Sequence, residues 1–373
     1  MHIAILTGPL LPVPAVQGGA VPRLWQGLAE VFVQRGHPVT LYCRSYPGQP
    51  AQETLKGVTY RRWGGFSQSR AVTRDLALDL IYSTGLMPQI HPADIVILNN
   101  FWLPALLPRL RPNIGRIVVN ANRYPKGQYR FYGRVDRVAA ASQAIAAAIV
   151  EQAPNLAGRV QVFANPLDTT VFSPPSAGRP PRDTKTLLYV GRLHPEKGVH
   201  RLLEAFQILS PRHPDLKLQI VGPSAEAQGG GGEQYLAQLK QLAAGRPVAF
   251  LPPVFDIHAL AKIYQAADLF CYPSLAERGE AMPVAPLEAM ATGLVPVVPN
   301  FACFADYIHP NQTGLVFDNQ RSTPALVEVL DQALGNWPHT LSMGQQAYVK
   351  AQTFSYAAIA EQYLAVFTAL LNP

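Results

Sequence analysis

The sequence predicts an α/β protein built from two domains, each with a doubly wound parallel sheet. Its 373 residues are too many for one ordinary domain and suit two of roughly 150 to 200 residues each. Short apolar, β-branched runs alternate with longer helical patterns, which is the order that parallel βαβ units require. The proline-rich, polar segment 173–181 interrupts this alternation and is typical of a connection between domains.

The first domain is expected over residues 1–173. It opens with an apolar run at 3–6 that leads into Thr7-Gly8-Pro9 without a basic leader, which predicts a first strand rather than a signal peptide. A helical pattern follows at 20–35. Further strands are expected at 39–43, 95–98 and 117–119.

The second domain is expected over residues 174–355. The glycine run 229–232 lacks the Lys-Ser/Thr pair of a phosphate-binding loop, so we interpret it as a flexible surface loop. Residues 356–373 are expected to form a C-terminal helix that packs back on the first domain, because the stretch is amphipathic and no strand pattern follows it. Strands of the second domain are expected at 186–190, 216–221, 248–250, 269–272 and 295–298.

The composition excludes several classes of protein. Only 15% of the residues are charged and 48% are hydrophobic, which argues against a disordered chain. Charges or prolines break every apolar run short of about 18 residues, so no transmembrane helix is expected. The 3 cysteines are far apart and predict reduced core thiols rather than disulfides or a zinc site. We expect a cytoplasmic protein and leave open a peripheral contact with the inner face of the membrane.

The net charge divides unevenly along the chain. Residues 1–174 hold 17 Lys or Arg against 8 Asp or Glu, a net charge of +9, whereas the rest holds 14 against 16, a net charge of −2. A basic first half suggests an anionic partner, such as a phosphorylated acceptor, an acidic membrane surface or a nucleic acid. Charge alone does not choose among these partners.

Two cations lie on one tight turn at the start of the second domain. Arg192 and Lys197 stand five positions apart, after a strand and just before a helical pattern. An Arg fork and a Lys point charge beside a helix start suit a diphosphate, since each can neutralise a different oxygen. A solvated surface turn would contain the same two residue types.

Two carboxylates follow the fourth strand of this domain. Glu280 lies in the loop, Pro283 fits the first turn of a helix, and Glu288 lies within that helix. Each carboxylate can accept two hydroxyl groups, as sugar or ribose diols require. The backbone N–H groups between them would face an anion.

Taken together, these motifs resemble the family 4 retaining glycosyltransferases of GT-B architecture, in which two doubly wound Rossmann-like domains face a cleft. The resemblance spans most of the chain. No Gly-x-Gly-x-x-Gly follows the first strand, which disfavours a dinucleotide-dependent oxidoreductase. The matching pieces, in chain order, are Gly18-Gly19 before a helix, Arg35-Gly36-His37-Pro38-Val39, 165–172, Gly191-Arg192 with Glu196-Lys197-Gly198, 267–270 with Pro273-Ser274, the pair Glu280 and Glu288, and Thr313-Gly314-Leu315-Val316.

The resemblance implies roles for these residues. Arg192 and Lys197 would hold the donor diphosphate, with Glu280 on a hydroxyl of the transferred sugar. Glu288 would bind the ribose hydroxyls, and the backbone near Val254 would meet the base. Gly18 and Gly19 would approach the phosphates from the first domain. The chain has no Asp-x-Asp, so the resemblance implies cationic side chains, with neither a bound metal nor a further cofactor, at the leaving nucleoside diphosphate.

The sequence departs from the family pattern at four places, one of which is the stretch near Ala302-Cys303 and Asp306, where Gly-Gly and Glu are usual. Met282-Pro283 stands where Phe-Gly is common, and Pro283 has no N–H for a phosphate, so Val284 is expected to supply that contact. Asn165-Pro166-Leu167-Asp168 replaces Asn-Gly-Val-Asp. A histidine common after a first-domain strand is missing, and Asn120 or Asn122 occupies the corresponding stretch.

The segment 123–137 of the first domain interleaves five cations with four aromatic residues. Single-stranded RNA is bound by such a mixture, although no RNA-binding motif accompanies it and no nucleic-acid partner is expected. An anionic acceptor or a lipid headgroup is the second interpretation, and a solvated basic face is the third.

The sequence therefore predicts a retaining hexosyltransferase. It would move a hexose of the glucose type from a UDP-sugar to a hydroxyl of a small metabolite, lipid or glycan, with an anionic or lipid-linked acceptor among the candidates. Two alternatives remain, a catalytically silent nucleotide-sugar-binding protein and a sugar-nucleotide epimerase of the same fold.

Overall fold

The computed structural model describes residues 1–67, 69, 71–176, 178 and 183–372, which form two α/β units. Unit 1 comprises Met1–Pro166 and Tyr356–Pro373, and unit 2 comprises Leu167–Ser355. Unit 2 thus begins before the segment that the sequence suggested as the connection. Of that segment, residues 177 and 179–181 lie outside the described part of the chain.

Unit 1 is built on an eight-stranded sheet with the order β3-β4-β2-β1-β5-β6-β7-β8. All neighbouring strands run parallel except β3 and β4, which form an antiparallel pair at one edge. The strands are β1 (Ile3–Leu6), β2 (Val39–Cys43), β3 (Gln52–Leu55), β4 (Val58–Arg62), β5 (Ile95–Leu98), β6 (Arg116–Ala121), β7 (Arg137–Ala140) and β8 (Val160–Val162).

Strand β1 lies at the centre of this sheet, with β2 on one side and β5 on the other. Every residue of Ile3–Leu6 is buried, which explains why the strand is a continuous apolar run. The chain order reverses between β1 and β5, so the carboxyl ends of these two strands mark the point where doubly wound sheets bind ligands.

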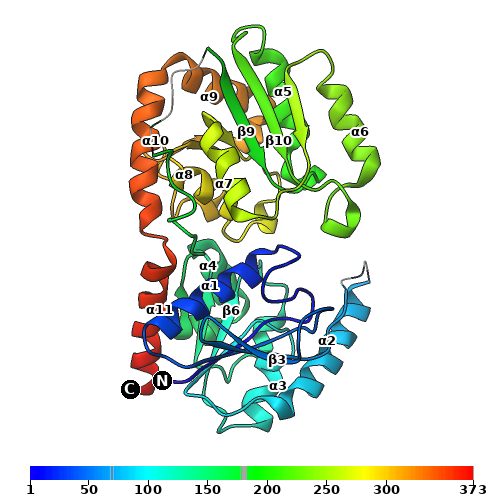
Figure 1. Ribbon diagram of the computed structural model, residues 1–373, viewed down its shortest axis with the longest axis vertical. Helices are drawn as coiled ribbons and strands as arrows, with labels where there is room; N and C mark the ends of the chain where they lie inside the picture. Colours follow the sequence, from blue (N-terminus) through cyan, green and yellow to red (C-terminus); the bar gives the residue numbers. More distant parts are fainter. Residues whose placement is uncertain (68, 70, 177, 179–182, 373) are drawn as a thin grey trace. The chain divides into compact units, whose positions relative to one another are not determined.

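Five helices accompany this sheet among the described residues: α1 (Ala20–Gln34), α2 (Val72–Leu86), α3 (Leu103–Leu110), α4 (Gln143–Gln152) and α11 (Tyr356–Leu371). Helices α1 and α11 lie side by side although they come from opposite ends of the sequence (Figure 1). Trp25 and Phe32 of α1 pack against Tyr363 of α11, and Phe32 also packs against Phe367. The last helix therefore completes the core of unit 1.

Unit 2 has a six-stranded, fully parallel sheet with the order β11-β10-β9-β12-β13-β14. Its strands are β9 (Lys185–Val190), β10 (Leu216–Val221), β11 (Val248–Leu251), β12 (Leu269–Cys271), β13 (Val295–Pro299) and β14 (Leu315–Phe317). Its helices are α5 (Val199–Leu209), α6 (Gly232–Leu242), α7 (Ile257–Ala266), α8 (Val284–Ala291), α9 (Ser322–Gly335) and α10 (Trp337–Gln352).

The chain order in unit 2 reverses between β9 and β12, which are neighbours in the sheet. The loops that leave the carboxyl ends of these two strands contain most of the residues singled out in the second half of the sequence. All 3 cysteines are buried and free. Within the described residues, no helix combines the length and the apolar character needed to cross a bilayer.

Candidate active site

A glycine allows the loop after β9 to pack closely against the loop after β12. Gly198 adopts a φ of +67°, and a Cβ at this position would lie 2.0 Å from the carbonyl oxygen of Pro273. Only glycine allows both the left-handed conformation and this close approach. Gly198 follows the short 3-10 helix Pro195–Lys197 and precedes α5. Its backbone conformation therefore sets how the turn that contains Lys197 is oriented.

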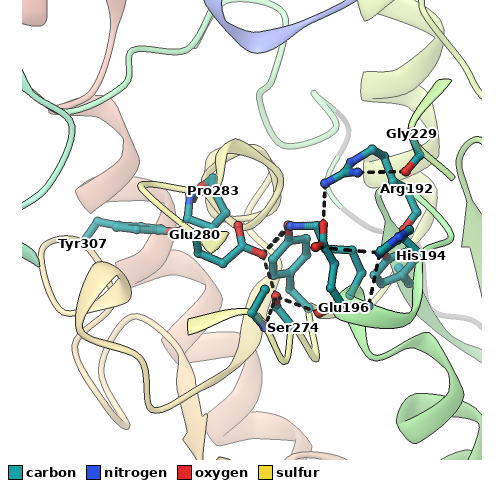
Figure 2. A network of polar contacts seen from close by, with 12 residues as sticks. Arg192, His194, Glu196, Gly229, Ser274, Glu280, Pro283 and Tyr307 are labelled. Atoms are coloured by element: carbon teal, nitrogen blue, oxygen red, sulfur yellow. Dashed lines mark hydrogen bonds and ion pairs between the residues drawn. The ribbon is translucent and has the colours of Figure 1, made fainter. Parts of the chain in front are cut away.

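Lys197 and Glu280 form a buried ion pair between these two loops. Figure 2 shows Glu280 and Ser274 with the dashed lines of this polar network. The Nζ atom of Lys197 lies 2.6 Å from Oε1 of Glu280, and the two side chains are only 8% and 6% exposed. The same ammonium lies 5.7 Å from the ring centroid of Tyr272. The sequence predicted both loops but not the pair, whose members are 83 positions apart.

Two hydroxyl groups support the carboxylate of Glu280. Ser274 Oγ donates to Oε1 over 2.6 Å, and Tyr272 OH donates to the same oxygen over 3.1 Å. Ser274 Oγ also lies 3.4 Å from the carbonyl of Glu196, but a hydroxyl has one proton and the shorter contact takes it. Burial, and secondarily the charge of Glu280, raises the pKa of Tyr272 well above its ordinary value, so the phenol remains a donor.

Three donors therefore converge on one oxygen of Glu280. Within the described residues, all hydrogen bonds to this carboxylate end on Oε1. Its other oxygen keeps its capacity to accept a hydroxyl group. The ammonium of Lys197 has three N–H groups, one of which Glu280 occupies.

Arg192 is held beside this pair by the glycine run that follows β10. Its guanidinium donates to the carbonyl of Gly229 over 2.8 Å and to Oε1 of Glu196 over 2.7 Å. The glycine run lies in a loop before α6, as predicted, but it is not confined to the surface, because Gly230 is buried and Gly231 N–H donates to the carbonyl of Leu193. A Cβ on Gly230 would lie 2.1 Å from the carbonyl oxygen of Ser224, so glycine permits close packing here.

Glu288 lies within α8, as predicted, and is buried. Tyr264 of α7 donates its hydroxyl to Glu288 Oε2 over 2.8 Å. Burial, followed by the charge of Glu288, raises the pKa of Tyr264, which keeps this donor protonated. Sequence reasoning missed Tyr264, since its distance from Glu288 depends on how α7 and α8 pack.

The residues between the two glutamates lie just before α8 and in its first turns. Met282 and Pro283 are buried, and Pro283 immediately precedes the helix instead of lying in its first turn. The hydroxyl of Tyr307 donates to the Pro283 carbonyl over 3.0 Å. Val284 is the first residue of α8, so its N–H is one of those that the helix leaves without an internal partner. Val254 is half-buried in the loop between β11 and α7.

The site residues predicted in the first half of the sequence all belong to unit 1. Gly18 and Gly19 precede α1 with φ values of 74° and 101°. Asn120 lies in β6, where its amide donates to Oδ1 of Asn99 over 2.7 Å. Asn122 follows the same strand and is half-buried.

Asn99 was not predicted and joins three elements at the carboxyl end of β5. Its Oδ1 also accepts a hydrogen bond from Trp25 Nε1 over 2.7 Å, and its amide donates to the carbonyl of Leu6. Its place directly after a buried strand was the one signal in the sequence.

Two sequence families match the chain and together span most of it. Residues 18–171 match the family described as Glycosyltransferase Family 4, and residues 175–350 match the family described as Glycosyl transferases group 1. The glycosyltransferase YtcC of Bacillus subtilis is 23% identical over all of this chain and 93% of its own length. D-inositol 3-phosphate glycosyltransferase of Corynebacterium aurimucosum is 33% identical, over 49% of this chain and 42% of that protein.

Solved structures with the same fold cover the whole chain. Sucrose-phosphate synthase from Thermosynechococcus elongatus superposes with a TM-score of 0.83 at 19% identity, over 100% of this chain and 99% of that one. Anabaena HepE in complex with UDP and glucose superposes with a TM-score of 0.74 at 16% identity, over 99% and 100% of the two chains.

The two sheets, each reversing its chain order at the centre, correspond to the two halves of the GT-B architecture shared by these structures. The family matches cover the first half and the second half in the expected order. The chain belongs to the family 4 glycosyltransferases.

Proposed function

We propose that this glycosyltransferase moves a hexose from a UDP-sugar to an acceptor hydroxyl with retention of the anomeric configuration. The observation that carries the proposal is the buried cluster of Lys197, Glu280, Ser274 and Tyr272 at the point where the sheet of unit 2 reverses. Ligands of doubly wound sheets bind at this point. The structure of HepE in complex with UDP and glucose supports a uridine donor.

In this proposal, the cations of unit 2 stabilise the leaving diphosphate. Lys197 retains two N–H groups beyond its bond to Glu280, and Arg192 retains three beyond its bonds to Gly229 and Glu196. Both can donate to phosphate oxygens, which gain negative charge as the bond to the sugar breaks. The side chains of this chain supply the positive charge themselves.

The carboxylates would orient the donor. The free oxygen of Glu280 would accept a hydroxyl of the transferred sugar, while its three donors hold the carboxylate in one orientation. The charge of a carboxylate is shared by its two oxygens, so the ion pair with Lys197 and the two hydroxyl donors lower the nucleophilicity of both, and we assign Glu280 to positioning the sugar and not to covalent attack. Glu288, oriented by Tyr264, would accept the ribose hydroxyls.

The transfer step would take place on one face of the sugar. The bond between C1 and the phosphate oxygen breaks, and its electron pair remains on that oxygen. The acceptor oxygen forms its bond to C1 on the same face, and its proton moves to the departing phosphate oxygen. The basic first half of the chain and the inositol phosphate named for one relative support an anionic acceptor.

Thermal unfolding with UDP, GDP, ADP and their sugars tests the donor. A nucleotide at about 100 times its Kd should stabilise its binding unit by about 2.7 kcal/mol, and the shift should vanish in Arg192→Ala. NMR of the product from an α-linked donor then tests retention, since a β-linked product would contradict it. Binding of the donor with no turnover on any hydroxyl acceptor would instead support the silent binding protein.

A further inference from the structure

Unit 1 contains a long stretch of sequence without any acidic residue. Between Asp94 and Asp136 lie 41 residues with 7 Lys or Arg and no Asp or Glu. This stretch runs from β5 through α3 and β6 to β7. It therefore concentrates the positive charge of the first half on a few adjoining elements.

Two large apolar side chains of this stretch project into solvent. Leu110, at the end of α3, is 64% exposed, and Phe131, in the 3-10 helix Gln128–Phe131, is 60% exposed. The guanidinium of Arg109 donates to the carbonyl of Phe131 over 3.5 Å, which places the two segments next to each other. Isolated apolar side chains are common on surfaces, but these two belong to adjoining segments that also contain several cations.

Three arginines lie within three positions of Leu110 or Phe131 in the sequence. Arg109 and Arg130 bond to backbone carbonyls, and in the described part of the chain Arg109, Arg130 and Arg134 form no ion pair. We call Arg109, Leu110, Arg130, Phe131 and Arg134 the basic apolar patch.

An open pocket of about 450 Å³ adjoins this patch, with Arg116 and Arg134 in its lining. The two acidic residues of the pocket are already engaged. Asp136 pairs with Arg116 over 3.2 Å and accepts from Ile117 N–H, and Asp94 accepts from His2 N–H over 2.7 Å. The positive charge of Arg134 is therefore left for an outside partner.

We propose that the basic apolar patch docks on an anionic lipid bilayer. Leu110 and Phe131 would enter the interface between headgroups and acyl chains, and the arginines would bind lipid phosphates. The patch surrounds the amino ends of β6 and β7, whereas Asn99 and Asn120 lie toward the opposite ends of the strands. Docking would therefore leave Asn99 and Asn120 uncovered.

The structure favours lipid over single-stranded RNA. A stacking platform needs several exposed aromatic faces. Tyr129 and Tyr132, which the sequence placed among the cations, are both buried and pack against each other with ring centroids 5.3 Å apart. Of the aromatic residues in the 3-10 helix, Phe131 alone is exposed. Leu110, in the adjoining segment, is aliphatic and has no ring on which a base could stack.

Vesicle sedimentation of the full chain tests the proposal. The protein should bind vesicles of equal parts phosphatidylcholine and phosphatidylglycerol and should not bind phosphatidylcholine alone. Leu110→Ser with Phe131→Ser should lower the partition coefficient on the mixed vesicles by about tenfold. Arg130→Gln with Arg134→Gln should also weaken binding, by roughly fivefold for each cation removed, and should reduce its salt sensitivity.

Matched controls come from unit 2. Leu341→Ser removes an apolar side chain that is similarly exposed, and Arg246→Gln with Lys262→Gln removes the same charge from another surface. The controls should bind as the parent does. Equal binding to both vesicle types, unchanged binding of both patch variants, or capture of a labelled RNA oligonucleotide in place of the vesicles would overturn the proposal. Because the donor-induced thermal shift is measured separately, its failure would not bear on membrane docking.

Discussion

The ammonium of Lys197 and the carboxylate of Glu280 are joined over 2.6 Å across two loops of unit 2, and both are almost entirely withdrawn from water. A buried pair is costly to break because the remaining charge has lost its partner, whereas removing both charges is often well tolerated. The stability of this pair and its chemical role can therefore be separated by mutation.

Lys197→Met and Glu280→Gln should each lower the free energy of unfolding of unit 2 by about 3 kcal/mol. The double variant should lose far less than the sum of these two values, because no unpaired buried charge is left. All three variants should lose most of their turnover. Calorimetry and initial rates measure the two effects, and strictly additive losses of stability would contradict the coupling.

Tyr264→Phe should raise the KM for the donor by about tenfold and change kcat little. The substitution removes the hydroxyl that donates to Glu288 Oε2, so the carboxylate is less well oriented for a ribose diol. Tyr82→Phe is the matched control, since the Tyr82 hydroxyl is buried without a hydrogen-bond partner in the described residues. A KM that is unchanged in both variants would show that the Tyr264 hydroxyl does not contribute to donor binding.

Asp79→Asn should stabilise unit 1 at neutral pH. Burial raises the pKa of the Asp79 carboxyl from 3.8 to about 6, against the opposing effect of hydrogen bonds from the N–H groups of Trp102 and Phe101. The folded protein then binds this proton more tightly than the unfolded chain does. The contribution of Asp79 to stability therefore falls as the pH rises from about 4 to 6 and stays low above that range.

Asparagine removes this charge and can still accept from the same N–H groups through its carbonyl oxygen. The stability gained by Asp79→Asn should grow across that pH range to at most about 3 kcal/mol at pH 7, as followed by thermal unfolding. Asp256→Asn is the control, because Asp256 caps α7 from an exposed position and should give no comparable gain. A gain in stability that is the same at every pH would show that it does not come from the raised pKa of Asp79.

Gly198→Ala should destabilise unit 2 by more than about 2 kcal/mol and reduce turnover. The added Cβ would meet the carbonyl of Pro273 in addition to straining the backbone. Gly245 has a similar φ of +72°, and a Cβ added there would meet nothing within 4 Å. Gly245→Ala should therefore cost only the backbone strain, about 1 kcal/mol. Equal losses of stability in the two variants would show that the close contact between the loops does not contribute to the stability of unit 2.

The sequence predicted the alternation of strands and helices because buried parallel strands are nearly continuous apolar runs. It missed the β3–β4 hairpin, since the residues of Gln52–Leu55 are mostly polar and exposed at the sheet edge. The short strands β7, β8 and β14 were missed as well, although β12, which also has only three residues, was predicted.

For the site, the sequence located the loops that contain Arg192, Lys197 and Glu280 but not the ion pair between Lys197 and Glu280. That pair exists because β9 and β12 are neighbours in the sheet, and strand order is not encoded in local spacing. The hydroxyl of Tyr264 reaches Glu288 through the packing of α7 against α8, whereas Ser274 lies only six positions from Glu280 and depends on the conformation of their shared loop. The glycine run was misjudged for a related reason, because its close contacts come from segments that are distant in sequence.

The pairing of α1 with α11 also imposes an order on the synthesis of the protein. Unit 1 is interrupted in the sequence by the whole of unit 2, so Trp25 and Phe32 leave the ribosome long before Tyr363 and Phe367 that cover them. At roughly 5 to 20 residues per second, the helix α1 waits many seconds with this apolar face unprotected. Unit 2 can therefore finish folding before unit 1 is complete.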